Sequence, residues 1–93
     1  MVVHCYLYKL RDRSDAEKAR TALLRMKDHI KEIKEMKVGI DFVGAGNSFD
    51  VVQISKFETQ EDFVIFGKHP YHAEVREYMN QLTLQSAKVD CEI

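Results

Sequence analysis

Three histidines, His4, His69 and His72, are the side chains of this sequence best suited to chemistry near neutral pH. Imidazole titrates close to physiological pH, so a histidine can accept or donate a proton under working conditions. Pro70 is typical of a first helical turn, which places His72 on that turn, while His4 stands in a strand-like segment. If the two face each other across a small cavity, His72 is suited to removing a proton next to a carbonyl. His4 would then orient His72 or hold a substrate oxygen.

Each of these histidines also has a structural interpretation. His69 directly precedes Pro70, so helix capping or loop hydrogen bonding explains it, although it stays a candidate ligand-binding residue. His4, on a mostly apolar strand face, is equally well a core histidine with a satisfied hydrogen bond. For His72 a functional and a structural role are equally well supported, because titratable groups of this kind occur at functional sites and also in purely structural positions.

Two tyrosines extend the candidate site. Tyr6 and Tyr8 alternate with His4 along one strand, so they share its face and can donate hydrogen bonds to a ligand. A pocket built from these side chains is expected to be small and largely apolar, and to suit an apolar ligand that contains a carbonyl group.

Metal and cofactor sites are not expected. His69 and His72 have the spacing of a helical ligand pair, but His69 lies before the first helical turn and no carboxylate is assured nearby. The segment 44–46, Gly-Ala-Gly, lacks the further glycine and the lysine of phosphate-binding loops. Cys5 and Cys91 are expected to be half-buried structural thiols in a reducing compartment, with a disulfide as the alternative if the terminal strands are neighbours.

Length and composition predict one soluble domain covering residues 1–93. Hydrophobic residues make up 45% of the chain, which argues against disorder. The 14 basic and 15 acidic residues give a net charge of -1 with no basic stripe, which argues against nucleic acid as a partner. The apolar runs are too short to span a membrane, and the N-terminus lacks the features of a signal peptide. We therefore expect a cytoplasmic protein.

Hydrophobic periodicity predicts an α+β fold with six elements. The strands are expected at 2–10, 38–43, 49–57 and 84–93. The first helix is capped by Ser14 and Glu17 and has an apolar stripe from Ala16 to Ile33. The second helical region runs from Thr59 to Leu82 and is interrupted after Gly67. The order strand, helix, strand, strand, helix, strand is that of the ferredoxin-like split βαβ fold. Both helical regions are then expected to cover one face of a four-stranded antiparallel sheet.

The other face of this sheet predicts a homodimer. The first strand is apolar on both sides, and the third strand also carries Val52 and Ile54 opposite Val51 and Phe57. A bare apolar face of this size exceeds what a soluble monomer usually exposes, so a second copy related by a two-fold axis is expected to cover it. The alternative is a monomer with scattered exposed apolar residues.

Several segments of the sequence match motifs of a known family. They are the opening Met1-Val2-Val3-His4 strand with its Tyr8-Lys9-Leu10 exit, the segment Phe57-Glu58-Thr59-Gln60-Glu61-Asp62-Phe63, the signature-like His69-Pro70-Tyr71-His72, and the terminal Val89-Asp90-Cys91-Glu92. With these segments the chain resembles, over nearly its whole length, the stress-responsive dimeric α+β barrel (Dabb) family. The resemblance implies a ferredoxin-like fold and a two-fold dimer whose sheets form a barrel.

The resemblance leaves several functions open. Some plant members cyclise polyketide chains, and the pocket residues of those cyclases correspond by position to His4, His72 and Phe66, although phenylalanine lacks the hydroxyl of their tyrosine. One hypothesis is therefore a cyclase-type or lyase-type acid–base catalyst that uses histidine. A non-catalytic dimeric module is the alternative, and a cofactor-independent monooxygenase follows only by analogy of fold. Whether the protein is an enzyme stays open.

Overall fold

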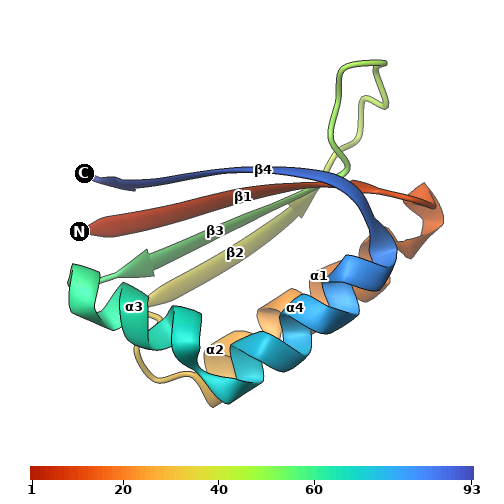
Figure 1. Ribbon diagram of the computed structural model, residues 1–93. Coiled ribbons are helices and arrows are strands. Elements are labelled where there is room, and N and C mark those ends of the chain that lie inside the picture. Colours follow the sequence, from red (N-terminus) through yellow and green to blue (C-terminus); the bar gives the residue numbers. More distant parts are fainter.

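The four strands of the computed structural model, which describes residues 1–93, form one antiparallel sheet in the order β2–β3–β1–β4 (Figure 1). The strands are β1 (Val2–Leu10), β2 (Glu35–Ile40), β3 (Val51–Phe57) and β4 (Thr83–Glu92). Since β1 lies between β3 and β4, the two ends of the chain are neighbours, and the Ile93 amide donates to the Met1 carbonyl at 2.9 Å. This is the predicted ferredoxin-like arrangement.

All helices lie on one face of the sheet, as Figure 1 shows. They are α1 (Ala16–Leu24), α2 (Met26–His29), α3 (Gln60–Lys68) and α4 (Pro70–Leu82), and a 3₁₀ turn η1 (Arg13–Asp15) precedes α1. Thr59 caps α3 as predicted, because its hydroxyl accepts a hydrogen bond from the Asp62 amide at 3.1 Å. None of these helices combines the length and hydropathy needed to traverse a lipid bilayer.

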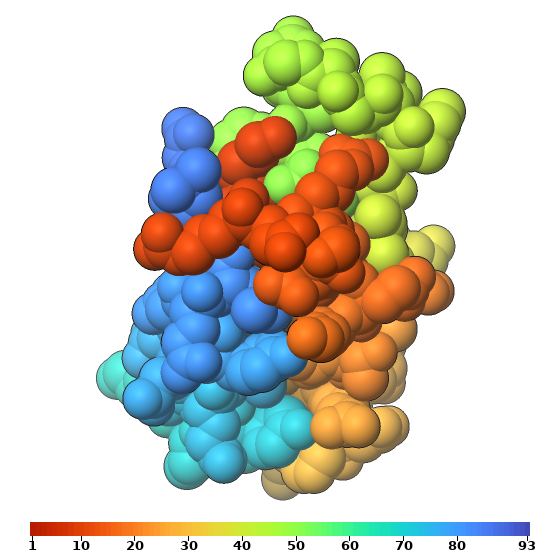
Figure 2. Space-filling model, turned by 90° about the vertical axis from the view of Figure 1, so that its right-hand side faces the viewer, coloured from red at the N-terminus to blue at the C-terminus, as the bar shows by residue number.

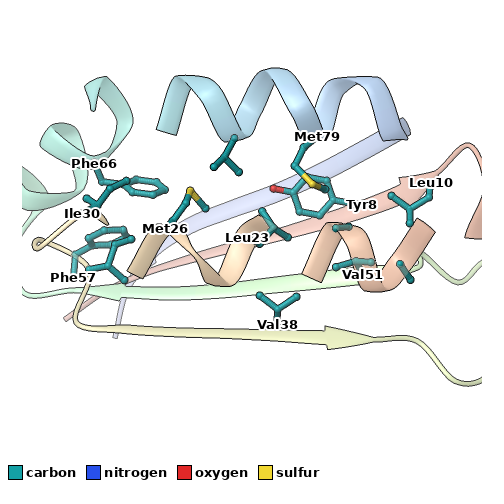
Figure 3. Packing of buried hydrophobic residues seen from close by; sticks show 14 of the residues in the cluster. Tyr8, Leu10, Leu23, Met26, Ile30, Val38, Val51, Phe57, Phe66 and Met79 are labelled. Atoms are coloured by element: carbon teal, nitrogen blue, oxygen red, sulfur yellow. The ribbon is translucent and has the colours of Figure 1, made fainter. Parts of the chain in front are cut away.

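The core lies between this face of the sheet and the helices (Figure 3). Alternate residues of β3, from Val51 to Phe57, are buried, and the apolar stripes of the helices meet them. Phe57 and Phe66 pack with ring centroids 4.9 Å apart at one end of this core. Burying one such side chain stabilises the fold by about 1.5–3 kcal/mol.

The predicted capping box at the start of α1 is wrong. Ser14 belongs to η1, and its amide and its hydroxyl both donate to the Asp12 carboxylate, at 2.9 and 2.7 Å. A carboxylate is a stronger acceptor than a hydroxyl, so Asp12 caps this turn and α1 begins two residues after Ser14, at Ala16.

The boundaries around β2 also differ from the prediction. The helical region ends at His29 and the chain is extended at Ile30, although Ile30 and Ile33 remain buried as part of the predicted stripe. β2 begins at Glu35, where an ion pair of 3.2 Å with Lys56 supports its ladder with β3. It ends before Asp41, because the side chain of Asp41 is bound to the loop that follows, with Oδ2 accepting from the Gly44 amide at 2.7 Å.

The face of the sheet opposite the helices is largely apolar and uncovered by the chain's own elements, with Lys37 and Lys56 on the same face toward β2. Cys5 of β1 stands between Ile54 of β3 and Val89 of β4 in the register, so the three side chains share this face. The same face carries Val3, Leu7, Val52, Ala87 and Cys91. Both thiols are free, and Cys91 is exposed in the single chain rather than half-buried as predicted, because β4 is an edge strand.

Candidate functional site

A cavity of about 320 Å³ lies between the sheet and the helices, and it contains most of the predicted site. Of the six candidates, five line it: His4, Tyr6, Tyr8, Phe66 and His72. A larger and shallower groove of about 580 Å³ runs between α1 and α4, but no histidine lines it. Of the three candidate histidines, His4 and His72 therefore lie at the smaller cavity.

His4 is buried in the cavity wall and is bound to a carboxylate. Its Nδ1 forms a hydrogen bond with Oδ1 of Asp90, which faces it directly across the β1–β4 ladder. The second oxygen, Oδ2, pairs with Lys88 Nζ at 3.2 Å. Burial alone would raise the pKa of Asp90, but the hydrogen bonds from His4 and Lys88 outweigh this and lower the pKa. Asp90 is thus ionised at neutral pH, and because a carboxylate can only accept, Nδ1 of His4 donates to it.

Aromatic rings surround His4 on its remaining sides. The ring centroids of Tyr6, Phe63 and Phe66 lie 5.7, 5.5 and 5.7 Å from that of His4. An apolar enclosure of this kind lowers the local dielectric and strengthens any interaction with the imidazole. The sequence interpretation of His4 as a satisfied core histidine and its interpretation as a site residue are therefore both compatible with its contacts.

His72 lies on the first turn of α4, as Pro70 predicts, and its ring packs on Phe66 with centroids 4.5 Å apart. Burial is the main reason that the pKa of His72 is lowered, and the charge of Arg76 and the neighbouring imidazoles of His4 and His69 act in the same direction. The backbone of Gly67 opposes the shift without reversing it. His72 is thus neutral at neutral pH, and its Nδ1 is buried with no hydrogen-bond partner. A buried polar atom left unpaired costs about 1–3 kcal/mol, which marks this nitrogen as a place where a ligand can compensate.

His69 has a different role from His72. Its Nδ1 accepts a hydrogen bond from the Tyr71 amide at 3.0 Å and so caps α4, as its structural interpretation predicts. It does not line the cavity. His29 is exposed and stacks on Tyr71 with centroids 3.9 Å apart, on the other side of α4.

The two tyrosines differ in how free their hydroxyls are. Tyr8 is buried and donates to Gln53 Oε1 at 2.8 Å, and Gln53 in turn donates to Ser55 at 3.1 Å. Burial, together with the neighbouring Tyr6, raises the pKa of Tyr8, so its hydroxyl stays protonated. Tyr6 lies nearer the edge of the sheet, where its hydroxyl contacts that of Ser86 at 3.2 Å. Only Tyr6 is therefore able to exchange its partner for a ligand without disturbing a buried network.

Sequence reasoning missed several residues of the site. On α4, Arg76 and Asn80 follow His72 at intervals of four, which places all three in one row along the helix, and all line the cavity. On β4, Lys88 and Asp90 belong to the polar set of an alternating strand, and this set faces the helices because it pairs with Tyr6 and His4. The spacing from His72 would have identified Arg76 and Asn80. The inward direction of the polar set requires the register, which the sequence of β4 does not contain.

A family model described as the Stress Responsive A/B Barrel Domain matches residues 2–93. No curated protein matches the chain. Solved structures with the same fold include a dimeric protein of unknown function and ferredoxin-like fold from Bacteroides fragilis. It has a TM-score of 0.85 and 23% identity, and the match covers 99% of this chain and 95% of that one.

Two further solved structures of the same fold have described activities. A hydroxynitrile lyase from Passiflora edulis has a TM-score of 0.86 and 17% identity over 99% of this chain and 92% of its own. An antibiotic biosynthesis monooxygenase has a TM-score of 0.78 and 9% identity over 100% of this chain and 98% of its own. Identities this low establish the shared fold, and function has to be argued from the site.

Proposed function

This chain belongs to the stress responsive A/B barrel domain family, and from that premise we propose that it is a homodimer that binds a small apolar carbonyl compound and moves a proton on it. The observation that carries the proposal is the pairing of two differently tuned histidines, His4 and His72, on one cavity. His4 is backed by a carboxylate, whereas His72 is held neutral. Two titratable groups with such different environments are typical of an acid–base site.

His4 is the better candidate for the base. The Asp90 carboxylate fixes the tautomer and stabilises the imidazolium that forms when Nε2 takes a proton from the carbon next to the carbonyl. This differs from the expectation drawn from the sequence, in which His72 is the base, because the pairing of Asp90 with His4 depends on the register of β1 and β4. A general base of this kind contributes about 10²- to 10⁴-fold to a rate.

His72 then acts on the oxygen of the carbonyl. A neutral imidazole still carries one N–H group, and this group donates a hydrogen bond that stabilises the negative charge of the enolate oxygen. The enolate formed at the cavity either takes the proton back from His4 or expels a leaving group, which corresponds to exchange in the first case and lyase chemistry in the second. The aromatic rings around His4 keep water from the enolate.

The dimer accounts for the apolar open face of the sheet. Val52 and Ile54 of β3 join residues of β1 and β4 there, and a second copy packed sheet to sheet buries them. The loop of residues 41–50 rises above this face, on the side away from the helices (Figures 1 and 2). Phe42 on this loop is 95% exposed, and Arg13 holds the base of the loop through ion pairs with Asp41 and Asp50. A loop that is anchored at its base and carries an exposed phenylalanine suits contact with the second copy.

A binding experiment tests the ligand proposal. Thermal unfolding is followed with a panel of neutral apolar ketones, namely acetophenone, phenylacetone and benzoylacetone, for the wild type and for His4→Gln, His72→Gln and His29→Gln. A ketone at a hundred times its Kd stabilises the folded protein by about 2.7 kcal/mol. We expect this stabilisation in the wild type and in His29→Gln, where the exposed histidine is outside the cavity, and a smaller one in the other two variants. Equal stabilisation of all four proteins would place the ketone elsewhere and contradict the proposal.

A further inference from the structure

The charges around the cavity are all of one sign. Arg76 and Lys88 are among the residues that line it, and no aspartate or glutamate is. The carboxylate of Asp90 contacts two of the lining residues, and both of its oxygens are engaged, one by His4 and one by Lys88. Arg76 and Lys88 are therefore two permanent positive charges at the cavity, and the single carboxylate beside them, that of Asp90, is shared between Lys88 and His4. Because the positive charge exceeds the negative charge, the cavity attracts an anion.

Arg76 is the freer of the two cations. It is exposed on α4, one turn beyond His72, and its charge contributes to the lowered pKa of His72. No hydrogen bond or ion pair of the structure involves its guanidinium, whereas Lys88 pairs with Asp90. A guanidinium presents parallel N–H donors in a planar fork that matches the two oxygens of a carboxylate.

The polar and apolar parts of the cavity are separated. Arg76, Asn80 and Lys88 are exposed, so they form its mouth. Other lining residues are buried and apolar, namely Leu23, Met26, Val75 and Met79, and Figure 3 shows Leu23, Met26 and Met79 in the core between the helices and the sheet. A ligand with an apolar body and a charged end fits this division in only one direction, with its body inside and its charge at the mouth.

We infer that the natural ligand is a small apolar oxo acid, whose carboxylate lies at the mouth between Arg76 and Lys88 and whose separate keto carbonyl is the group on which His4 and His72 act. The inference rests on the proposed function, since it names the class of carbonyl compound that the same cavity takes. The volume of about 320 Å³ is near the lower limit of small-molecule pockets, which suits a single ring with a short side chain. Arg76 and Lys88 act as binding residues that set specificity, and the histidines keep the roles given above.

The test compares an acid with its uncharged isostere. Phenylacetate and phenylacetamide are titrated into the wild type, Arg76→Gln, Lys88→Gln and the control Arg11→Gln, with calorimetry for affinity and the His72 ring signals for location. Arg11 is exposed and outside the cavity, so this control also loses one positive charge. A hydrogen bond to a charged group is worth about 1.5–3 kcal/mol, which is about 10- to 100-fold in affinity.

We expect the wild type and Arg11→Gln to bind phenylacetate more tightly than phenylacetamide, and Arg76→Gln to lose about 10- to 100-fold for phenylacetate alone. Lys88→Gln loses less, because Lys88 already has a partner. Similar wild-type affinity for the two probes, or equal loss in Arg76→Gln and Arg11→Gln, would overturn the anion site and leave the ketone-binding proposal intact. If neither probe nor any ketone of the panel binds, the proposed function fails, and the inference fails with it.

Discussion

His4 and Asp90 are 86 residues apart in the sequence and face each other directly across the β1–β4 ladder, where the carboxylate binds Nδ1 of the imidazole. The fold brings the first and last strands together, so a histidine from one end of the chain acquires a carboxylate from the other. An orienting carboxylate behind an imidazole is a recurrent arrangement in acid–base catalysis. The same pair also links the two terminal strands, so it has a measurable effect on stability.

Asp90→Asn is expected to lower stability at neutral pH and not at low pH. The folded-state pKa of Asp90 is below its ordinary value of 3.8. Its contribution is therefore fully present above the unfolded-state value and is lost as the pH falls through the folded-state pKa. Urea unfolding of the wild type and the variant, from neutral pH to well below the ordinary carboxyl value of 3.8, measures this.

The matched control for that variant is Glu92→Gln, which removes a carboxylate from the same strand that contacts Gln60 instead of a histidine. A difference between wild type and Asp90→Asn that stays constant down to the lowest pH would mean that packing, and not the charge of Asp90, accounts for the effect.

His72 is expected to titrate below its ordinary value of 6.5, because burial and the charge of Arg76 disfavour its protonated form. A depressed histidine pKa means that this group favours folding above the unfolded-state value and opposes it as the pH falls. In Arg76→Gln the pKa of His72 should move upward, and in Arg11→Gln it should not. Titration of the histidine ring signals by NMR measures both pKa values. If the pKa of His72 is the same in the wild type and in Arg76→Gln, the charge of Arg76 does not act on His72.

Val52→Asp is expected to convert the protein to monomers. The wild type should have a solution mass of two chains of 10.9 kDa each, because the open face that holds Val52 is then buried against a second copy. The register partners of Val52 are Leu7 and Gly39, so a charge placed there is left unpaired in the interface. Analytical ultracentrifugation at micromolar concentration measures the mass.

Val64→Asp is the control for the dimer, since Val64 is also a partly exposed apolar residue but lies on α3, away from the open face. The dimer should persist in this variant. A wild type that sediments as a single chain would contradict the proposed assembly whatever the variants do.

The order of the elements and the division of β1 into two faces follow from the sequence, because both depend on local periodicity. Alternation alone places His4, Tyr6 and Tyr8 together, and the position of Pro70 predicts the turn that carries His72. The end of α2 does not follow, since Ile30 and Ile33 are buried whether the chain there is helical or extended. Helical periodicity therefore continues past the true end of the helix.

The parts of the site that depend on long-range register were not predictable. The alternation in β4 separates Lys88 and Asp90 from Val89 and Cys91, but it does not tell which set faces the helices. The polar set faces them, because β1 places His4 and Tyr6 opposite, and the apolar set faces the second copy in the proposed dimer. The usual expectation of apolar residues toward the chain's own core would have given the opposite assignment.

The central claim, that His4 removes a proton from a bound carbonyl compound, is tested most directly by hydrogen–deuterium exchange at the methylene group of phenylacetone in D₂O, followed by NMR. The wild type should accelerate exchange over buffer, His4→Gln should reduce the acceleration by about 10²-fold or more, and His29→Gln should retain it. Acceleration that is equal in the wild type and His4→Gln, or absent in a wild type that binds the ketone, would contradict the account.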